Sequence, residues 1–391
     1  MSINFTAEQE MIRKSVIDFA KKDVAPIAYE IDRDEIFPAE NFKKLGELDM
    51  LGITVPEEYG GAGYGYTEMC IVIEELAKVC ISTSAVFASH ADLCVDNLCR
   101  NGNEEQKKKY LPGLCSAKLI GGLAMTEPEA GSDVMSMGLY AEKKGNEYIL
   151  NGTKIFITNG PIGDIFIVYA KTDTPDGSQR VTAFIVEKEF EGFEAGKKYE
   201  KMGWRGSPTG ELIFNNCRVP EKNILGKEGM GGHILMSGLN TERIVMAAQA
   251  VGLAKGAFEY VLNYAKERKQ FGKSLTEFQM IQGKLADMSM EIELGHLISY
   301  HGAALADNYS KGPALTDKAL RKKMNLVASH AKLFTSEMVM RVTTEAVQMM
   351  GGYGYMKEFP VERMMRDAKL SSIGGGTSEI QRLIIARELI S

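Results

Sequence analysis

The stretch EYILNGTKIFITNG, residues 147–160, decides the fold class of this chain. Its apolar residues predict two short β-strands, and Asn151-Gly152 is a dipeptide typical of the tight turn in a β-hairpin. Further strand-like runs lie on its C-terminal side, at 164–172, 180–188 and 210–220. Because these runs are short and end at turn residues, the sequence predicts an antiparallel β domain in this part of the chain.

Helical patterns flank this β block on both sides. Near the N-terminus, Thr6-x-x-Gln9 is typical of a capping box, and Ile12, Val16 and Phe19 recur at helical spacing after it. On the other side, Asn240-Thr241 precedes a second periodic run. Helices are also predicted at 40–51, 66–79, 103–111, 274–308, 316–350 and 377–389.

The order of these patterns indicates the architecture. Strands are confined to the middle of the chain and do not alternate with helices, which favours an α+β fold over a parallel α/β sheet. We expect an N-terminal helical domain at 1–120, a middle β domain at 121–232 and a C-terminal helical domain at 233–391.

Composition and charge exclude several classes of protein. The 391 residues carry 46 Lys+Arg and 52 Asp+Glu, a formal charge of −6 without a basic block, so we expect no nucleic-acid partner. No apolar run approaches the roughly 18 residues of a membrane span, and the N-terminus lacks the apolar core of a secretory signal. The six cysteines form no C-x-x-C pair, which suits a cytoplasmic protein. The five histidines show no metal-ligand spacing, so we assign no metal.

Four segments carry residues suited to ligand binding. They are LAMTEPEAGSDV (123–134), KIFITNG (154–160), ERKQFGKSLTEFQ (267–279) and the region 348–389 with its two Gly-rich loops. A Gly-rich turn before a helix exposes backbone N–H groups that bind phosphate, although many such loops are purely structural. Phe156 and Thr158 are two apart on a strand, so both side chains should face the same way.

In their order and spacing these segments resemble the acyl-CoA dehydrogenases, a flavin-dependent family, over nearly the whole chain. The resemblance implies the acyl-CoA dehydrogenase fold, FAD as cofactor and an acyl-CoA substrate. It also implies an electron-transfer flavoprotein as electron acceptor and a homo-oligomer, expected to be a tetramer.

The resemblance also assigns contacts to individual residues. Arg268, Phe271 and Gln279 match residues that reach the FAD of a neighbouring subunit, and Phe156 stands where many members have Trp. The matched flavin-binding positions are Leu123, Met125, Thr126, Ser132, Phe156, Thr158, Arg268, Phe271, Gln279, Gln348, Met349, Gly351, Gly352, Thr377 and Glu379. The matched substrate-binding positions are Leu93, Ser132, Asn240, Thr241, Arg243 and Gly374.

The catalytic base is the point at which this chain departs from the commonest family pattern. Most members have Glu just before the Gly-Thr-Ser of the last helix, whereas this chain has Gly375, whose backbone N–H could still bind the thioester oxygen. A minority, including isovaleryl-CoA dehydrogenases, carry the base on another helix, at a position matched by Glu242. Alternatively, Glu242 only complements a helix N-terminus, two residues after an Asn cap. We expect Glu242 to be the base.

Asp92 is a second unusual carboxylate. The segment ASHADLCVDNL (88–98) matches the helix that lines the acyl cavity, where related members have Asn or Ser. Asp92 is either a surface or capping residue or a carboxylate inside the pocket. In the second case it would bind a polar or ring-bearing acyl group, or remove the acidified γ-proton of a cyclic enoyl-CoA.

The resemblance therefore implies an FAD-dependent dehydrogenase that desaturates a short branched or cyclic acyl-CoA between Cα and Cβ. Two alternatives within the family are a dehydrogenase of a cyclic enoyl-CoA, of the cyclohexene-carboxyl-CoA type with Asp92 as base, and an enoyl-CoA reductase. An alternative from a different class is a CoA-binding protein without catalysis.

Overall fold

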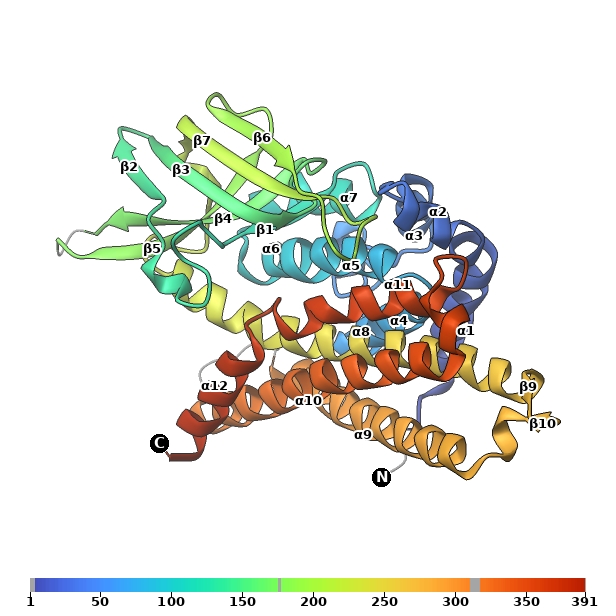
Figure 1. Ribbon diagram of the computed structural model, residues 1–391. Coiled ribbons are helices and arrows are strands. Elements are labelled where there is room, and N and C mark those ends of the chain that lie inside the picture. The colour runs from blue at the N-terminus through green and yellow to red at the C-terminus, as the bar shows by residue number, and fades with distance from the viewer. Residues whose placement is uncertain (1–3, 175–176, 310–316, 391) are drawn as a thin grey trace.

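The computed structural model describes residues 4–174, 177–309 and 317–390. Figure 1 shows a twisted β-sheet on one side, short helices packed against it, and long helices on the other side. The order is therefore helical, β and helical, as the sequence predicts.

The N-terminal helices begin with the predicted capping box. The Gln9 N–H donates to Thr6 Oγ1 at 3.2 Å, and the Thr6 N–H donates to Gln9 Oε1 at 2.9 Å. One helix has the predicted bounds, 66–79. The α-helices are α1 (Ala7–Phe19), α2 (Ala28–Arg33), α3 (Ala39–Glu47), α4 (Tyr66–Val79), α5 (Ile81–Ala88), α6 (Asn97–Asn101) and α7 (Glu104–Cys115), and a π-helical segment η4 (Ser89–Asp96) joins α5 to α6.

The middle domain holds one sheet with the order β6-β7-β3-β2-β4-β5-β8. Most neighbours are antiparallel, but β1 and β2 each pair with β4 in parallel. The strands are β1 (Gly121–Ala124), β2 (Tyr140–Lys144), β3 (Glu147–Thr158), β4 (Ile165–Asp173), β5 (Gln179–Glu187), β6 (Phe193–Lys198), β7 (Thr209–Pro220) and β8 (Ile224–Leu225).

The predicted hairpin at Asn151-Gly152 is wrong. Residues 147–158 form a single strand, β3, which pairs with β7 on both sides of Gly152. Gly152 has φ +142° at a break in the register, so the dipeptide accommodates a bulge and not a chain reversal. The reversal lies at Gly145, between β2 and β3.

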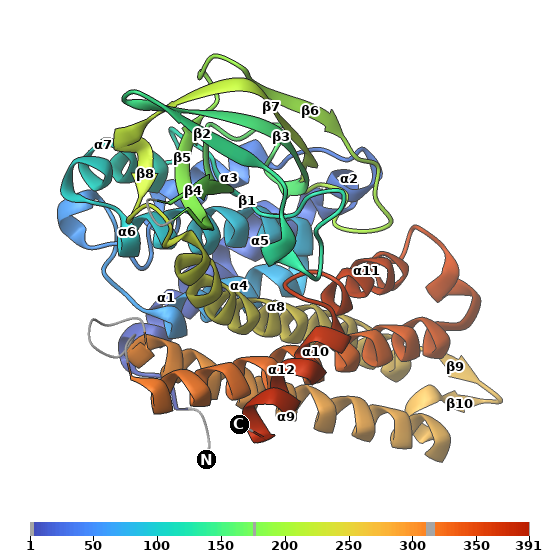
Figure 2. The same cartoon turned by 90° about the vertical axis from the view of Figure 1, so that its left-hand side faces the viewer.

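The C-terminal domain is built on α8, α9 and α10, which lie side by side in both views (Figures 1 and 2). The predicted start of α8 at Asn240 is wrong, because this helix begins at Gly231. The predicted start of α10 at 316 lies outside the described residues. The elements are α8 (Gly231–Glu267), β9 (Lys269–Gln270), β10 (Lys273–Ser274), α9 (Gln279–Tyr309), α10 (Lys318–Met350), α11 (Pro360–Ala368) and α12 (Ser378–Ile390).

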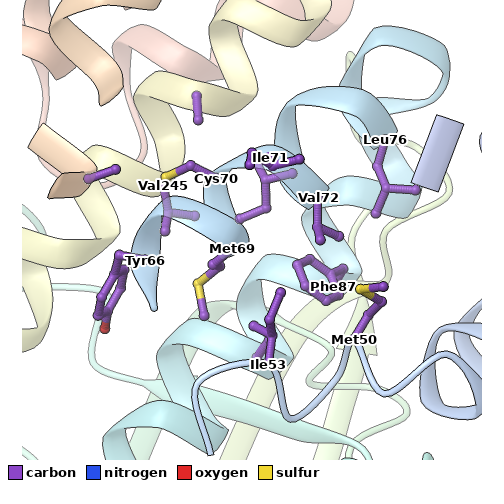
Figure 3. Close-up of a cluster of buried hydrophobic side chains, with 14 of the residues drawn as sticks. Met50, Ile53, Tyr66, Met69, Cys70, Ile71, Val72, Leu76, Phe87 and Val245 are labelled. Carbon is purple, nitrogen blue, oxygen red and sulfur yellow. The ribbon is translucent and has the colours of Figure 1, made fainter. Parts of the chain in front are cut away.

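Helix α8 is held in place by a close contact with α4. A Cβ added at Gly252 or Gly256 would collide with the α4 carbonyl oxygen of Glu74 or of Lys78, so only glycine permits this approach. Figure 3 shows Val245 of α8 beside the apolar side chains of α4, including Cys70 and Ile71. This packing fixes the segment of α8 that carries residue 242.

Among the helices of the described residues, α8 alone is long and apolar enough to cross a membrane by length and composition. The apolar window is 72% buried inside the structure, as in the core helix of a globular domain.

Candidate functional site

A channel of about 790 Å³ opens between the N-terminal half of α8, the start of α10, helix α12 and the loop after β1. Ser132 lines one wall, and Asn240 and Arg243 of α8 line another. Gly375 and Gly376 form its inner boundary. The channel therefore brings together two of the four ligand-binding segments and the predicted substrate-binding positions Asn240 and Arg243.

Glu242 lines a second cavity instead of the channel, and the residue is half-buried, with its Oε2 atom shielded from solvent. Its Oε2 atom has no hydrogen-bond partner in the described part of the chain. A Cβ built on Gly375 would lie 3.7 Å from Glu242 Oε1. The two positions that the family uses for the base therefore face each other, although they are 133 residues apart in sequence.

Gly375 must be glycine in this arrangement. Its φ is +61°, which side chains rarely adopt, and an added Cβ would overlap Met246 Sδ. Within the described residues, no acceptor is found for the Gly375 N–H. A backbone donor is therefore free beside the Glu242 carboxylate.

Burial and neighbouring charges change the pKa of Glu242 in opposite directions. Burial raises the pKa of Glu242, while the neighbouring cations Arg243 and Lys332 lower it. Burial lowers the pKa of Arg243 to about 10, and its Nη1 donates to Asn240 Oδ1 at 2.8 Å. Since α8 begins at Gly231, Glu242 is in the helix interior, and the alternative that it complements a helix N-terminus is wrong.

Asp92 shares this second, enclosed cavity with Glu242, of only about 10 Å³. Its side chain is only 2% exposed, which excludes a surface role. Asp92 Oδ1 accepts from the Tyr66 hydroxyl at 3.3 Å, and Oδ2 has no partner among the described residues. Burial, followed by the charges of Asp96 and Glu242, holds the pKa of Asp92 well above its usual range.

Below Asp92 lies a buried polar group that the sequence did not reveal. The Tyr66 hydroxyl donates to Asp96 Oδ2 at 2.6 Å, and Arg100 Nε donates to the same oxygen at 2.5 Å. Arg100 pairs with Asp96, and although its charge lowers the pKa of Asp92, no cation of the described residues forms an ion pair with the Asp92 carboxyl. The i,i+4 spacing of Asp96 and Arg100 was the available signal.

The loop after β1 is anchored to β3 by a buried lysine, which was also missed. Lys154 is 0% exposed, and its ammonium donates to Met125 O at 2.9 Å and to Glu127 Oε1 at 2.7 Å. The Ile155 N–H donates to Thr126 O at 2.9 Å. These contacts place Thr126 next to the exposed part of β3.

Phe156 lies within the second register shift of β3, between Lys154 and Ile157, and Thr158 follows that shift. Phe156 has φ +58°, is 63% exposed and stacks obliquely on Tyr199 with ring centroids 5.4 Å apart. Ile157 between them is buried, so the predicted common direction of Phe156 and Thr158 agrees with the strand. They form an open aromatic and hydroxyl surface.

A separate hollow lies at the other end of α8. It gathers Arg268 with Gln348, Met349, Gly351 and Gly352. Phe271, at the tip of the β9–β10 hairpin, is 93% exposed, and Gln279 is also exposed. Glu242 and the end of α8 at Glu267 are about 38 Å apart along the helix axis. One chain therefore does not bring all the predicted flavin-binding residues together.

Some of the remaining predicted residues line a cavity, and others do not. Leu93 and Leu123 line the enclosed cavity. Thr241 is fully buried, its hydroxyl donates to Gly238 O at 2.8 Å, and it does not line the channel. Gly374 comes just before the two glycines that line the channel. Thr377 Oγ1 accepts from the Ile380 N–H at 3.3 Å. Glu379 is exposed in the first turn of α12. The described residues contain no group of three potential metal ligands.

Comparison with known proteins decides the family. The models of the acyl-CoA dehydrogenase N-terminal, middle and C-terminal domains match residues 6–118, 122–217 and 229–390. The chain belongs to the acyl-CoA dehydrogenase family. This acyl-CoA dehydrogenase is an oxidoreductase, and FAD is its cofactor. The domain boundaries expected from the sequence stay a prediction.

Two curated relatives and one solved structure are similar over their whole length or nearly so. The short-chain specific acyl-CoA dehydrogenase of Clostridium acetobutylicum is 45% identical and covers 100% of both chains. The mitochondrial isovaleryl-CoA dehydrogenase of Solanum tuberosum is 45% identical over 99% of this chain and 92% of its own. The butyryl-CoA dehydrogenase structure from Megasphaera elsdenii has a TM-score of 0.93, with 40% identity and full coverage of both chains.

The residues present fit FAD at both ends of α8. A Cβ added at Gly351 or Gly352 would meet nothing within 4 Å, so the loop forms an open cradle that a bound group can fill. Arg268 lies beside it with its guanidinium carbon 5.4 Å from the centre of the Tyr353 ring. At the other end, the exposed ring of Phe156 offers a flat apolar surface.

Proposed function

We propose that this acyl-CoA dehydrogenase desaturates a short branched or cyclic acyl-CoA between Cα and Cβ, with Glu242 as the base. The observation that carries the proposal is the buried, unpartnered Oε2 of Glu242, whose carboxylate faces a glycine at the family's commoner base position. A buried carboxylate with an unsatisfied oxygen is costly unless a ligand uses it.

In the proposed reaction, Glu242 removes the α-proton. The Gly375 N–H binds the thioester oxygen and stabilises the charge that develops there as the proton leaves. Bound FAD supplies the acceptor for the β-hydrogen, which leaves as hydride. The raised pKa of Glu242 makes its carboxylate a stronger base than a solvated glutamate.

The channel supports an acyl-CoA as ligand. Its outer part is lined by cations of α10 and α12, which suit the phosphates of CoA: Lys318, Arg321, Lys322 and Arg387. These residues were not predicted from the sequence, where they resemble a solvated helix face. At Gly375 the Met246 sulfur fills the space that a side chain at 375 would take, so Met246 would limit the size of a branch or ring next to the reacting carbons.

For FAD, we propose a site shared between two subunits. Thr126, Phe156 and Thr158 of one subunit would hold the ring, and Arg268, Phe271 and Gly351-Gly352 of another would hold the phosphates. The exposure of Phe271 and the distance between the two groups support this proposal. We also propose a homotetramer and an electron-transfer flavoprotein as acceptor, from the family resemblance. All six cysteines are free, which supports a cytoplasmic location.

A second candidate function uses Asp92. Its unpartnered Oδ2 lies in the same enclosed cavity as Glu242, so two carboxyl groups flank the place where an acyl tail would lie. In a cyclic enoyl-CoA, Asp92 would remove the proton at the far end of the conjugated system. The same residues would also serve an enoyl-CoA reductase, and assays in both directions distinguish the two.

The test is an anaerobic bleaching experiment with the purified FAD-loaded protein. Straight, branched, cyclic and cyclic-unsaturated acyl-CoAs are added separately, and the loss of the flavin absorbance is followed. Fastest bleaching by a short branched or saturated cyclic acyl-CoA supports the leading proposal, whereas bleaching by cyclic enoyl-CoAs alone supports the second. If acyl-CoAs bind but none bleaches the flavin, the chain is a binding protein and both proposals fail.

A further inference from the structure

Lys332, in the middle of α10, is a buried lysine that the proposed mechanism does not use. The residue is 0% exposed, and its Nζ donates to the backbone oxygen of Gly376 at 2.6 Å. No carboxylate of the described residues lies within ion-pair distance of it. Burial lowers its pKa to about 8.

The contrast with Lys154 shows that this arrangement is unusual within the molecule. Lys154 is equally buried and also donates to a loop carbonyl, but Glu127 compensates its charge at 2.7 Å. A buried cation without a paired carboxylate is costly. The charge of Glu242 raises the pKa of Lys332 and so partly offsets the lowering by burial.

The loop that Lys332 contacts has no side chains at Gly375 and Gly376 that could fix its conformation. Gly375 and Gly376 have φ +61° and +86° and no side chains. Two fully buried side chains hold their carbonyl groups from below: Lys332 donates to Gly376 O, and Gln381 Nε2 donates to Gly376 O at 2.9 Å and to Gly375 O at 3.2 Å. The direction of the Gly375 N–H therefore depends on these two donors.

The same lysine influences Glu242. The charged or titratable groups that act on the Glu242 carboxyl come from four elements: Arg243 on α8, Lys332 on α10, Asp92 on η4 and Tyr169 on β4. Of these, only Arg243 and Lys332 favour the ionised form. Arg243 is also bonded to Asn240, whereas Lys332 contacts the loop that faces Glu242.

We propose that Lys332 is a positioning residue for the dehydrogenation. Its hydrogen bond to Gly376 orients the Gly375 N–H, and its charge keeps the Glu242 carboxylate ionised. This inference rests on the proposed function, because it assigns Lys332 to the two groups that would carry out the proton transfer.

The test separates the charge from the hydrogen bond in the FAD-loaded enzyme. Lys332→Gln removes the charge and keeps a donor, Lys332→Arg keeps both, and Gln381→Met removes the other donor to Gly376 O without changing any charge. Lys323→Gln, at an exposed position on the same helix, is the control. For each variant we measure flavin content, binding of acyl-CoA and the rate of substrate-driven bleaching against pH.

We expect the acidic limb of the pH profile to move upward by about one unit in Lys332→Gln, because an opposite charge near the carboxylate is lost. Lys332→Arg should restore the wild-type limb. Gln381→Met should lower the bleaching rate by roughly 10- to 100-fold without moving the limb, because the Gly375 N–H is misplaced. Flavin content should stay near that of the Lys323→Gln control.

An unmoved acidic limb in Lys332→Gln would overturn the charge role. An unchanged rate in Gln381→Met would overturn the role of the loop. If Lys332→Gln does not fold, the pH limb of Lys332→Arg decides: a limb displaced from the wild type contradicts the proposal. Failure of the proposed function is distinguishable, because Glu242→Gln would then retain the wild-type rate and limb whatever Lys332 does.

Discussion

The two ends of α8 differ in how completely a single chain builds them. At the N-terminal half, Asp92 is buried, and Glu242 lies in the same cavity and beside Gly375, half-buried with its Oε2 shielded from solvent. At the C-terminal end, Arg268 and the Gly351-Gly352 loop line an open hollow, and Phe271 of the following hairpin is exposed. On the proposed assignment, one chain encloses the groups that transfer the proton, whereas cofactor binding depends on surfaces that one chain leaves open.

The sharpest test of this difference is Glu242→Gln. We expect substrate-driven flavin bleaching to fall by about 10²–10⁴-fold, because the group that removes the α-proton is lost. Flavin content and acyl-CoA binding should be retained. The measurement is stopped-flow absorbance under anaerobic conditions.

Glu259→Gln is the matched control for this change. Glu259 lies on the same helix but is exposed, with only a surface ion pair to Lys78 at 2.6 Å, and such pairs contribute little. Near wild-type bleaching in Glu242→Gln would remove this residue from the chemistry and make Asp92 the leading base.

Asp92→Asn tests whether the enclosed end holds one base or two. Asn is nearly isosteric, so bleaching by saturated acyl-CoAs through Glu242 should survive. Activity on cyclic enoyl-CoAs should fall by about 10²-fold or more, if Asp92 is the base for those substrates. Equal activity on every substrate would make Asp92 structural, and loss of all activity would contradict the choice of Glu242.

Arg268→Ala tests the open end. We expect FAD to bind about tenfold more weakly or worse, because a charge-assisted contact to phosphate is lost. The oligomer should also dissociate more readily into smaller species. Flavin absorbance per chain and light scattering measure the two effects, and Lys269→Ala, an exposed neighbour, is the control. Unchanged flavin content and size would contradict a shared site.

The smallest expected effect is in the pH profile of the wild type. Burial raises the pKa of Glu242, and its ionised form is the active base. The bleaching rate should therefore fall as the pH is lowered through this raised pKa, with a midpoint above the ordinary 4.5 of a glutamate. A midpoint at or below 4.5 would show that a different group limits the rate.

Local sequence patterns predicted the helical, β and helical order, and for α4 even the bounds. They failed where tertiary contacts override local preference. Asn151-Gly152 suits a turn, but pairing of β3 with β7 on both sides keeps the strand continuous. The first turns of α8 contain Gly231 and Gly238, which disfavour a helix in isolation, so its true start was not recognised.

The predicted site depended on the family resemblance, and its supporting residues were missed. Lys332 looks like one of many helix-surface lysines. A signal was nevertheless present, because Ala328, Thr335 and Val339 place it on the apolar face of α10 at helical spacing. The Tyr66–Asp96 contact joins separate segments, so no local pattern could have revealed it.

The contact between Gly375 and Met246 bears on how such enzymes diverge. A glutamate introduced at position 375 would meet Met246 Sδ and a backbone angle that disfavours side chains. Moving the base from α8 to the loop would therefore require coordinated changes at positions 242, 246 and 375. A lineage that passed through single substitutions would first produce an enzyme with two crowded carboxylates or with none. Single substitutions therefore do not readily convert one placement of the base into the other, and the two placements should mark separate branches of descent.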